Sequence, residues 1–264
     1  MQETKDSWQS GNPYDQFMGR WSRLIAHEFL QWLSVPVKRR WLDVGCGTGA
    51  LSALVLKSKN PIEVAGVDTS AEFVRHAVET NSNSRMRFEV ASAESLPSET
   101  DYFDATISGL ALNFIPQPEQ AIAEMTRVTK QNGTVAVYVW DYADGMQMLR
   151  YFWDAAADLD MKATEFDEGL RFPLCREDAL KELFEKSDLH DIQSKPIEVP
   201  TVFQDFDDYW QPFLGQVGPA PSYVSALDET RREALRNALQ TKLSVATDGT
   251  IPLVARAWAI QGRV

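Results

Sequence analysis

Between Arg40 and Val139, short runs of apolar and β-branched residues alternate with longer segments whose apolar residues recur every three or four positions. Short apolar runs are typical of strands covered on both faces, and the longer segments are typical of amphipathic helices. The alternation therefore predicts repeated strand–helix units and a mostly parallel sheet. The strands are expected at Trp41–Val44, Ile62–Val67, Met86–Val90, Phe103–Ser108 and Thr134–Val139.

Two helices between these strands carry end signals. Thr69 and Glu72 have the spacing of a capping box, which predicts Thr69 as the N-cap of the helix after the second strand. Pro118 opens a later helix, because proline is favoured in a first helical turn. Lys130 and Gly133 stand where the last-turn cation and the C-terminal glycine of that helix are expected.

The patterns on either side of this region are weaker. Residues 1–39 hold aromatic and aliphatic residues in near-helical spacing, which predicts an N-terminal helical cap. Further helices are expected at Met146–Leu159 and Glu177–Lys186, and further strands at Ile192–Val199 and Ile251–Ile260.

The composition narrows the class of protein. A chain of 264 residues with 44% hydrophobic residues can bury the core of one α/β domain with an insertion. A net charge of −12 disfavours nucleic acid as a partner, because phosphate binding needs a basic face. No apolar run is long enough to span a bilayer, and no secretory signal is visible. We therefore expect a cytoplasmic protein that does not insert into membranes.

Several catalytic chemistries lack their residues. His27, His76 and His190 are scattered along the chain, so no metal site is expected. Cys46 lies inside a glycine-rich turn, where a small residue is needed, and Cys175 stands alone. The sequence contains neither the G-x-S-x-G motif of hydrolases nor the G-x-x-x-x-G-K-[ST] motif of phosphate-binding loops.

The most informative segment is Gly45–Gly49, three alternating glycines between the first predicted strand and a helix. Glycines permit positive φ there and let a ligand touch the backbone, at the strand end where open α/β sheets bind ligands. Asp68 ends the second strand, where a carboxylate can accept hydrogen bonds from both hydroxyls of a ribose. The combination predicts a site for a ligand that contains adenosine.

Two kinds of ligand fit such a site. The G-x-G-x-G spacing differs from the G-x-G-x-x-G spacing of NAD and FAD sites. Asp43 precedes Gly45 by two residues, and its charge would repel a pyrophosphate but attract an ammonium and a sulfonium. These features favour S-adenosylmethionine and leave an NAD(P)-binding oxidoreductase as an alternative.

Leu42–Gly49 resembles the first motif of the seven-stranded, S-adenosylmethionine-dependent methyltransferases. The nearest group is the small-molecule methyltransferases related to quinone-biosynthesis C-methyltransferases, and the resemblance covers about residues 40 to 140. The other matching segments are Val67–Ser70, Ala93–Pro97, Phe103–Ala105 with Leu110, and Gln131–Thr134.

The resemblance implies a fold and a division of the chain. The fold is a three-layer α/β/α, Rossmann-like sheet, mostly parallel, with an antiparallel last strand and the order 3-2-1-4-5-7-6. The helical cap over residues 1–39 precedes a core formed by residues 40–200 and 247–264. Residues 201–246, rich in aromatic residues, would form a lid inserted over the substrate pocket.

The resemblance also implies a set of cofactor contacts. Arg20 would pair with the carboxylate of the cofactor, and Asp68 would hold its ribose. Ser92 stands where the family usually has an aspartate that contacts adenine, so we expect the backbone of Ala93 to dominate there. The expected cofactor-binding residues are Arg20, Asp43, Gly45, Cys46, Gly47, Asp68, Thr69, Ser92, Ala93, Glu94 and Leu110.

Methyl transfer from a sulfonium needs positioning and exclusion of water more than a fixed catalytic group. The sequence offers only candidates for acid–base roles, and these are Tyr14, Asn113 and Asp141. The substrate pocket is expected to be lined by Trp21, Asn113, Trp140, Tyr209 and Trp210.

The stretch after the fourth strand lacks the [DN]-P-P-[YF] motif of the enzymes that methylate amino groups of DNA bases. A small-molecule acceptor is therefore expected, methylated at O, N or C. A non-catalytic protein that binds S-adenosylmethionine or S-adenosylhomocysteine is an alternative. We expect a monomer or a homodimer.

Overall fold

The computed structural model describes residues 19–215 and 218–264, and the chain divides into two compact units. The sheet unit comprises Arg23–Val139, Leu174–Ile197 and Ala257–Val264. The described part of the helical unit comprises residues 19–22, Trp140–Pro173 and, apart from residues 216–217, Glu198–Arg256. The predicted division into cap, core and lid stays a prediction.

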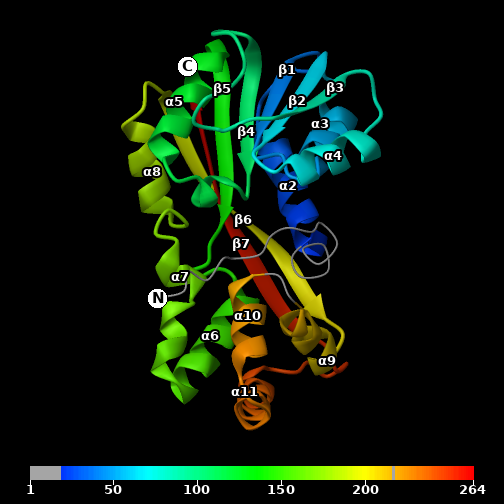
Figure 1. Cartoon of the computed structure of the whole chain (residues 1–264), viewed down its shortest axis with the longest axis vertical. Helices are drawn as coiled ribbons and strands as arrows, with labels where there is room; N and C mark the ends of the chain where they lie inside the picture. The colour runs from blue at the N-terminus through cyan, green and yellow to red at the C-terminus, as the bar shows by residue number, and fades with distance from the viewer. Residues whose placement is uncertain (1–18, 216–217) are drawn as a thin grey trace. The chain divides into compact units, whose positions relative to one another are not determined.

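Seven strands form one sheet in the order β3-β2-β1-β4-β5-β7-β6 (Figure 1). This order and the antiparallel seventh strand confirm the predicted Rossmann-like fold. The strands are β1 Arg40–Val44, β2 Glu63–Asp68, β3 Met86–Val90, β4 Phe103–Gly109, β5 Thr129–Trp140, β6 His190–Phe203 and β7 Ile251–Arg263.

The parallel strands bring the predicted ligand-binding segments to one edge of the sheet. Asp43 of β1 is paired in register with Gly66 of β2 and with Ile107 of β4. The segments that follow β1, β2 and β4 therefore leave the sheet side by side. Ligands of open α/β sheets bind at this edge.

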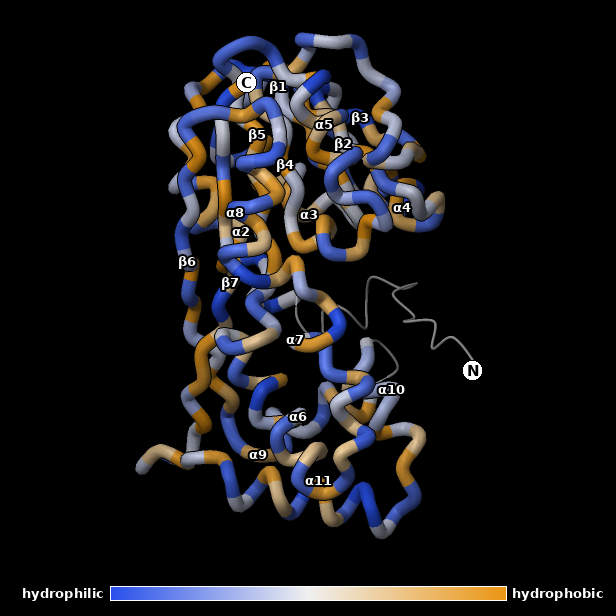
Figure 2. Tube along the Cα trace, turned by 90° about the vertical axis from the view of Figure 1, so that its left-hand side faces the viewer, coloured by the Kyte–Doolittle hydropathy of each residue, from blue (hydrophilic) through white to orange (hydrophobic). Residues whose placement is uncertain are grey.

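Helices of the sheet unit cover these strands. α3 and α4 pack against β2, α4 also packs against β3, and α5 packs against β4 and α8. Figure 2 shows hydrophobic residues along β5, where residues 135–139 are all buried. The helices are α2 Arg20–Trp32 (residues 20–22 belong to the helical unit), α3 Ala50–Lys59, α4 Ala71–Thr80, η2 Leu112–Phe114, α5 Pro118–Val128 and α8 Glu177–Glu185.

Two predicted helix ends are wrong. The N-cap of α4 is Ser70, whose hydroxyl accepts the Phe73 N–H at 3.3 Å, and not Thr69. Asp68 accepts the Ser70 N–H at 2.9 Å, and this bond sets the turn one residue later than the capping box predicts.

The second wrong prediction concerns the C-terminal end of α5. The helix stops at Val128, and Lys130 and Gly133 lie in β5 rather than in a helical turn. Thr129 is already extended and pairs with Phe103 of β4, so strand pairing ends the helix.

Aromatic side chains form much of the core of the helical unit. Phe152 stacks on Phe213 with ring centroids 4.4 Å apart, and the buried Tyr209 hydroxyl donates to the Met148 carbonyl at 2.9 Å. The elements that follow β5 are α6 Gln147–Leu159, η3 Met161–Glu165 and α7 Glu168–Arg171. Those that follow β6 are α9 Phe206–Trp210, η4 Gln211–Leu214, α10 Pro219–Ala226 and α11 Glu229–Lys242.

Within the described part of the chain, no helix has the length and apolar character needed to cross a membrane. The same residues contain no group of three or more metal-ligating side chains placed to hold an ion.

Candidate cofactor and acceptor site

The glycine turn after β1 has the backbone that its sequence predicts. Gly45 and Gly47 have φ values of 73° and 52°, which L-residues with a side chain rarely adopt. A Cβ atom on Gly45 would lie 2.4 Å from the Ala111 Cβ, so this position has no room for a side chain. A Cβ on Gly47 would meet nothing within 4 Å, so open space faces the backbone there.

Asp68 joins this turn to the second strand. Its Oδ2 accepts the Gly47 N–H at 2.9 Å, and its Oδ1 accepts the Ser70 N–H at the same distance. The Val67 carbonyl accepts a further N–H from Gly45 at 2.8 Å. The end of β2 thus fixes both the glycine turn and the start of α4.

Asp43 is the buried charge of the site. The residue is 1% exposed, and its Oδ2 accepts the Ser52 hydroxyl at 2.6 Å. Its Oδ1 is buried without a hydrogen-bond partner among the described residues. Burial raises the pKa of Asp43 to about 7, in spite of the hydrogen bonds from Ser52.

Cys46 lies in the same turn and is buried. Burial, followed by the charges of Asp43 and Asp68, raises the pKa of its thiol far above the ordinary value. The thiol is therefore neutral at physiological pH and unsuited to nucleophilic attack, in agreement with the small-residue role expected for it.

The segment after β3 is held by its own side chains. Ser92 Oγ accepts the Glu94 N–H at 3.2 Å, and Glu94 Oε1 accepts the Gln117 N–H at 2.9 Å. Ala93 between them is buried. Ser92 is thus hydrogen-bonded within its own loop, and Glu94 connects this loop to Gln117.

The segment after β4 adds Leu110 and Asn113. Leu110 has a φ of 58° and donates its N–H to the Tyr138 carbonyl at 2.8 Å. Asn113 Nδ2 is buried without a hydrogen-bond partner among the described residues. Thr69 is exposed beside Asp68. The predicted cofactor residues from Asp43 to Leu110 therefore all follow or end strands at one edge of the sheet.

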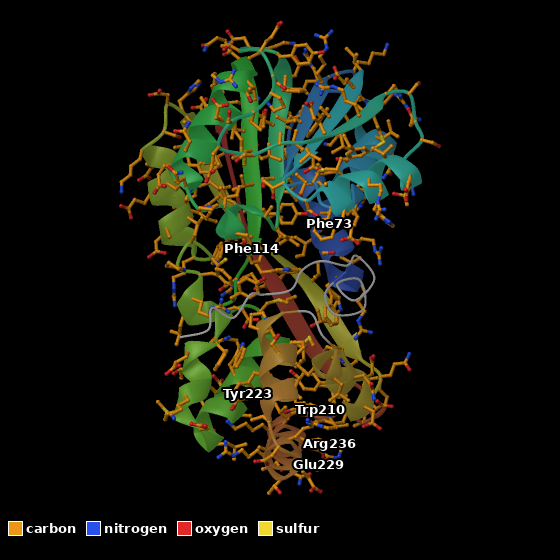
Figure 3. The ribbon with its side chains drawn as sticks, viewed as in Figure 1. Phe73, Phe114, Trp210, Tyr223, Glu229 and Arg236 are labelled. Carbon is orange, nitrogen blue, oxygen red and sulfur yellow. The ribbon has the colours of Figure 1, made fainter. Side chains whose placement is uncertain are left out.

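Two aromatic residues that are not among the predicted site residues also lie at this edge. Figure 3 labels Phe73 on α4 and Phe114 on η2, where the parallel strands end. Phe114 is 41% exposed in spite of its apolar ring. The exposure of this ring is a property of the fold, so the sequence alone carries no signal that distinguishes Phe114 from a core aromatic residue.

The other predicted residues lie in the helical unit, apart from Tyr14, which is outside the described residues. The Arg20 guanidinium lies over the rings of Trp21 and Phe203, 4.5 Å and 4.9 Å from their centroids. It also pairs with Asp208 at 3.4 Å. Arg20 thus has aromatic and acidic neighbours within its own unit.

Asp141 is tied down on both oxygens. Its Oδ2 accepts Arg256 Nε at 2.7 Å, and its Oδ1 accepts the Asp144 N–H at 3.0 Å. Trp140 beside it is buried, and its Nε1 has no hydrogen-bond partner among the described residues.

Tyr209 and Trp210 are both buried in the helical unit. Burial raises the pKa of the Tyr209 hydroxyl well above its ordinary value, so this group is a neutral donor at physiological pH.

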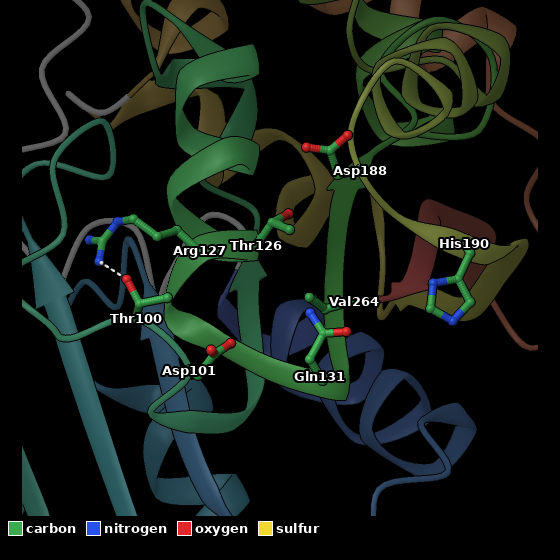
Figure 4. A pocket seen from close by; sticks show the side chains of 8 residues that line it. All are labelled: Thr100, Asp101, Thr126, Arg127, Gln131, Asp188, His190 and Val264. Carbon is green, nitrogen blue, oxygen red and sulfur yellow. Dashed lines mark hydrogen bonds between the residues drawn. The ribbon is translucent and has the colours of Figure 1, made fainter.

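A separate surface pocket of about 460 Å³ lies at the opposite edge of the sheet unit, where β5 and β6 begin (Figure 4). Its Arg127 side chain is already bonded to Glu124 and to the Leu96 and Ser98 carbonyls. The pocket contains none of the predicted site residues.

The comparison with known families agrees with this geometry. Residues 42–137 match the family model described as a methyltransferase domain. Residues 42–137 therefore form a methyltransferase domain. Such a domain was expected from the Leu42–Gly49 motif.

Curated methyltransferase relatives are similar over part of their length. The 2-methyl-6-phytyl-1,4-hydroquinone methyltransferase 2 of rice, Oryza sativa, is 29% identical over 180 residues, which cover 68% of this chain and 47% of that protein. The ubiquinone/menaquinone biosynthesis C-methyltransferase of Syntrophotalea carbinolica is 33% identical over 120 residues, covering 45% of this chain and 49% of that protein. The chain thus spans about half the length of the curated relatives it matches.

Solved methyltransferase structures share the fold. Phosphoethanolamine N-methyltransferase 2 of Haemonchus contortus, in complex with phosphomonomethylethanolamine and S-adenosylhomocysteine, has a TM-score of 0.60 and 15% identity. The alignment covers 96% of this chain and 56% of that chain. At such identity the likeness concerns the fold alone.

Proposed function

We propose that this protein transfers a methyl group from S-adenosylmethionine to a small-molecule acceptor. The observation that carries the proposal is the Asp43 carboxylate beside the glycine turn, which is 1% exposed and whose Oδ1 has no partner among the described residues. A buried carboxylate without a cationic partner is costly and is relieved by a cationic ligand. The ammonium and sulfonium of the donor are such cations, whereas the pyrophosphate of a dinucleotide would be repelled.

We assign the parts of this cofactor to the predicted residues, of which all but Arg20 lie in the sheet unit. We assign the ribose hydroxyls to Asp68 and the adenine to Ala93, Glu94 and Leu110, with Ser92 as a lesser contact. Thr69 and Cys46 complete the wall of the site beside Gly45 and Gly47, where the open space above Gly47 admits a ligand to the backbone. Arg20 is assigned to the cofactor carboxylate.

The cofactor, when bound, supplies a methyl group already activated by its sulfonium. What remains for the chain is to hold an acceptor in line and to keep water away. We assign this to Trp21, Trp140, Tyr209 and Trp210, and to Asn113, whose Nδ2 donates to no described residue. Tyr14, Asn113 and Asp141 stay the candidates for moving a proton from the acceptor.

The curated relatives favour one class of acceptor as the first to test. One is named as a methyltransferase of a hydroquinone, and the other as a C-methyltransferase of ubiquinone and menaquinone biosynthesis. The aromatic side chains of residues 201–246 suit a planar, apolar acceptor. We propose that this segment forms a lid, inserted in the sequence between the core parts 40–200 and 247–264, and that residues 1–39 form a cap. We propose a cytoplasmic monomer or homodimer, and the net charge of −12 disfavours a nucleic-acid partner.

Calorimetry with S-adenosylhomocysteine and, separately, NAD tests the cofactor assignment. We expect binding of the first ligand and none of the second. Tight NAD binding that S-adenosylmethionine cannot displace would overturn the proposal in favour of an oxidoreductase.

A transfer assay then tests catalysis. The protein is incubated with methyl-labelled S-adenosylmethionine and a panel of hydroquinones and phenols, and labelled products are sought by chromatography. Binding of S-adenosylhomocysteine without transfer to any small molecule of a broad metabolite extract would favour a non-catalytic binding protein.

A further inference from the structure

Ser52 contacts the Asp43 carboxylate from the first turn of α3. The residue is 0% exposed, and its hydroxyl donates to Asp43 Oδ2 at 2.6 Å. The Ser52 main-chain N–H also acts on this carboxyl as a hydrogen-bond donor. Serine is a modest helix former, and alanine would suit a buried helical position better if packing alone mattered. The hydroxyl therefore has a role toward Asp43.

The two carboxylate oxygens differ because of this contact. Oδ2 is held by Ser52, whereas Oδ1 is buried without a partner among the described residues. One fixed oxygen determines the rotation of the carboxylate plane and hence where the other oxygen lies. We propose that Ser52 is a positioning residue, which holds Asp43 so that Oδ1 stays available to the cationic end of the cofactor. This inference rests on the proposed function.

Ser52 also affects the charge of Asp43. Burial and the nearby charge of Asp68 favour the protonated acid, and the hydrogen bonds from Ser52 favour the carboxylate. The neighbouring Cys46 thiol is neutral at physiological pH because its pKa is raised, so it adds no charge. Without the Ser52 hydroxyl, the pKa of Asp43 should rise further, and a protonated Asp43 attracts no cation.

The test compares cofactor affinity across pH in the full chain. Binding of S-adenosylhomocysteine is measured by calorimetry from pH 5.5 to pH 9 for wild type, Ser52→Ala and Ser52→Cys, the last placing a larger and weaker donor at the same position. Ser58→Ala is the matched control, because Ser58 lies on the exposed face of the same helix and donates only to the Leu54 carbonyl.

We expect Ser52→Ala to weaken binding about three- to tenfold at pH 7 and to move the pH midpoint of binding upward, with the loss shrinking near pH 9. Ser52→Cys should show the same shift to a smaller extent, and Ser58→Ala should match wild type. A change of packing alone would lower affinity equally at every pH.

Two different results would overturn the positioning role of Ser52 and the proposed function, respectively. Equal pH midpoints in wild type and both Ser52 variants would overturn the positioning role and leave the proposed function standing. Failure of the wild-type chain to bind S-adenosylhomocysteine at any pH would overturn the proposed function itself. If Ser52→Ala does not fold, as judged by circular dichroism, Ser52→Cys alone decides the midpoint.

Discussion

The Asp68 carboxylate lies 2.9 Å from the Gly47 main-chain nitrogen, so the acid at the end of β2 is hydrogen-bonded to the turn that follows β1. The same side chain fixes the start of α4 through Ser70. Each oxygen thus has one backbone partner and keeps capacity for another donor. Asp68 can hold the turn and still accept hydrogen bonds from ribose hydroxyls.

Replacement of Asp68 should therefore affect ligand binding and the turn together. We expect Asp68→Ala to weaken S-adenosylhomocysteine binding by about 1–3 kcal/mol, as is usual for lost hydrogen bonds to a charged acceptor. Calorimetry at pH 8 measures this. Asp188→Ala is the control, because it removes the same charge from the exposed pocket at the opposite edge of the sheet unit. Equal affinities in Asp68→Ala and wild type would remove Asp68 from the ribose role.

The glycine turn permits a second prediction from a matched pair of substitutions. Gly45→Ala combines a φ of 73° with a Cβ 2.4 Å from Ala111, so we expect a loss of unfolding free energy of roughly 2–5 kcal/mol. Gly47→Ala has a positive φ but free space, so we expect a smaller loss of about 1–2 kcal/mol.

Ligand affinity is the second quantity in which the two glycine variants should differ. The methyl group of Gly47→Ala would occupy the open space in front of the turn, so a folded variant should bind S-adenosylhomocysteine much more weakly than wild type. Urea unfolding and calorimetry give the two quantities. Wild-type affinity in Gly47→Ala would show that the cofactor does not approach this backbone.

Burial of Asp43 makes the stability of the ligand-free protein depend on pH. Its pKa is raised from 3.8 to about 7 in the folded chain, so the protonated carboxyl stabilises the fold at low pH. This stabilisation is fully present below pH 3.8 and is lost as the pH rises to about 7.

The substitution Asp43→Asn removes this titration and keeps the shape of the side chain. We expect the unfolding free energy of Asp43→Asn relative to wild type to increase between pH 4 and pH 7, by at most about 4 kcal/mol, and then to stay constant. Urea unfolding without ligand measures it. A difference that does not vary with pH would contradict an Asp43 pKa near 7.

The positions of the strands and the glycine turn could be predicted because their signals are local, whereas the strand order was implied by the family resemblance. Short apolar runs mark the strands, and a strand end followed by Gly45–Gly49 marks the turn. The start of α4 was misplaced by one residue because Asp68, outside the capping box, holds Ser70. The end of α5 was misplaced because pairing with β4 overrides the helical pattern after Val128.

The contacts that orient side chains of the site could not be predicted in the same way. Arg256 is 115 residues from Asp141 in the sequence, and no periodic pattern indicates that the two meet. In the sequence, Ser52 is an ordinary polar residue of a helix, and only its distance to Asp43 in the structure reveals the contact. Residue types identify candidates, and tertiary contacts decide which of their atoms remain free.

The ion pair of Asp141 with Arg256 makes it possible to test whether Asp141 has a catalytic or a structural role. Arg256 lies 2.6 Å from the 1% exposed Asp141 and 3.6 Å from the exposed Glu198. Removing either partner of this partly buried pair should lower the unfolding free energy by about 1–3 kcal/mol, whereas Glu198→Gln should change little. The double variant should lose less than the sum of the single losses, because the two residues interact.

Turnover then discriminates between the two roles of Asp141. If Asp141 accepts the proton, Asp141→Asn should lower kcat well beyond its effect on cofactor affinity. Arg256→Met should lower stability to a similar degree but keep most of kcat. Steady-state methyl transfer with an accepted small molecule, measured at a temperature where both variants are folded, provides the comparison. If kcat falls in parallel in the two variants, Asp141 acts through its ion pair with Arg256, and Tyr14 and Asn113 remain as the candidates for proton transfer.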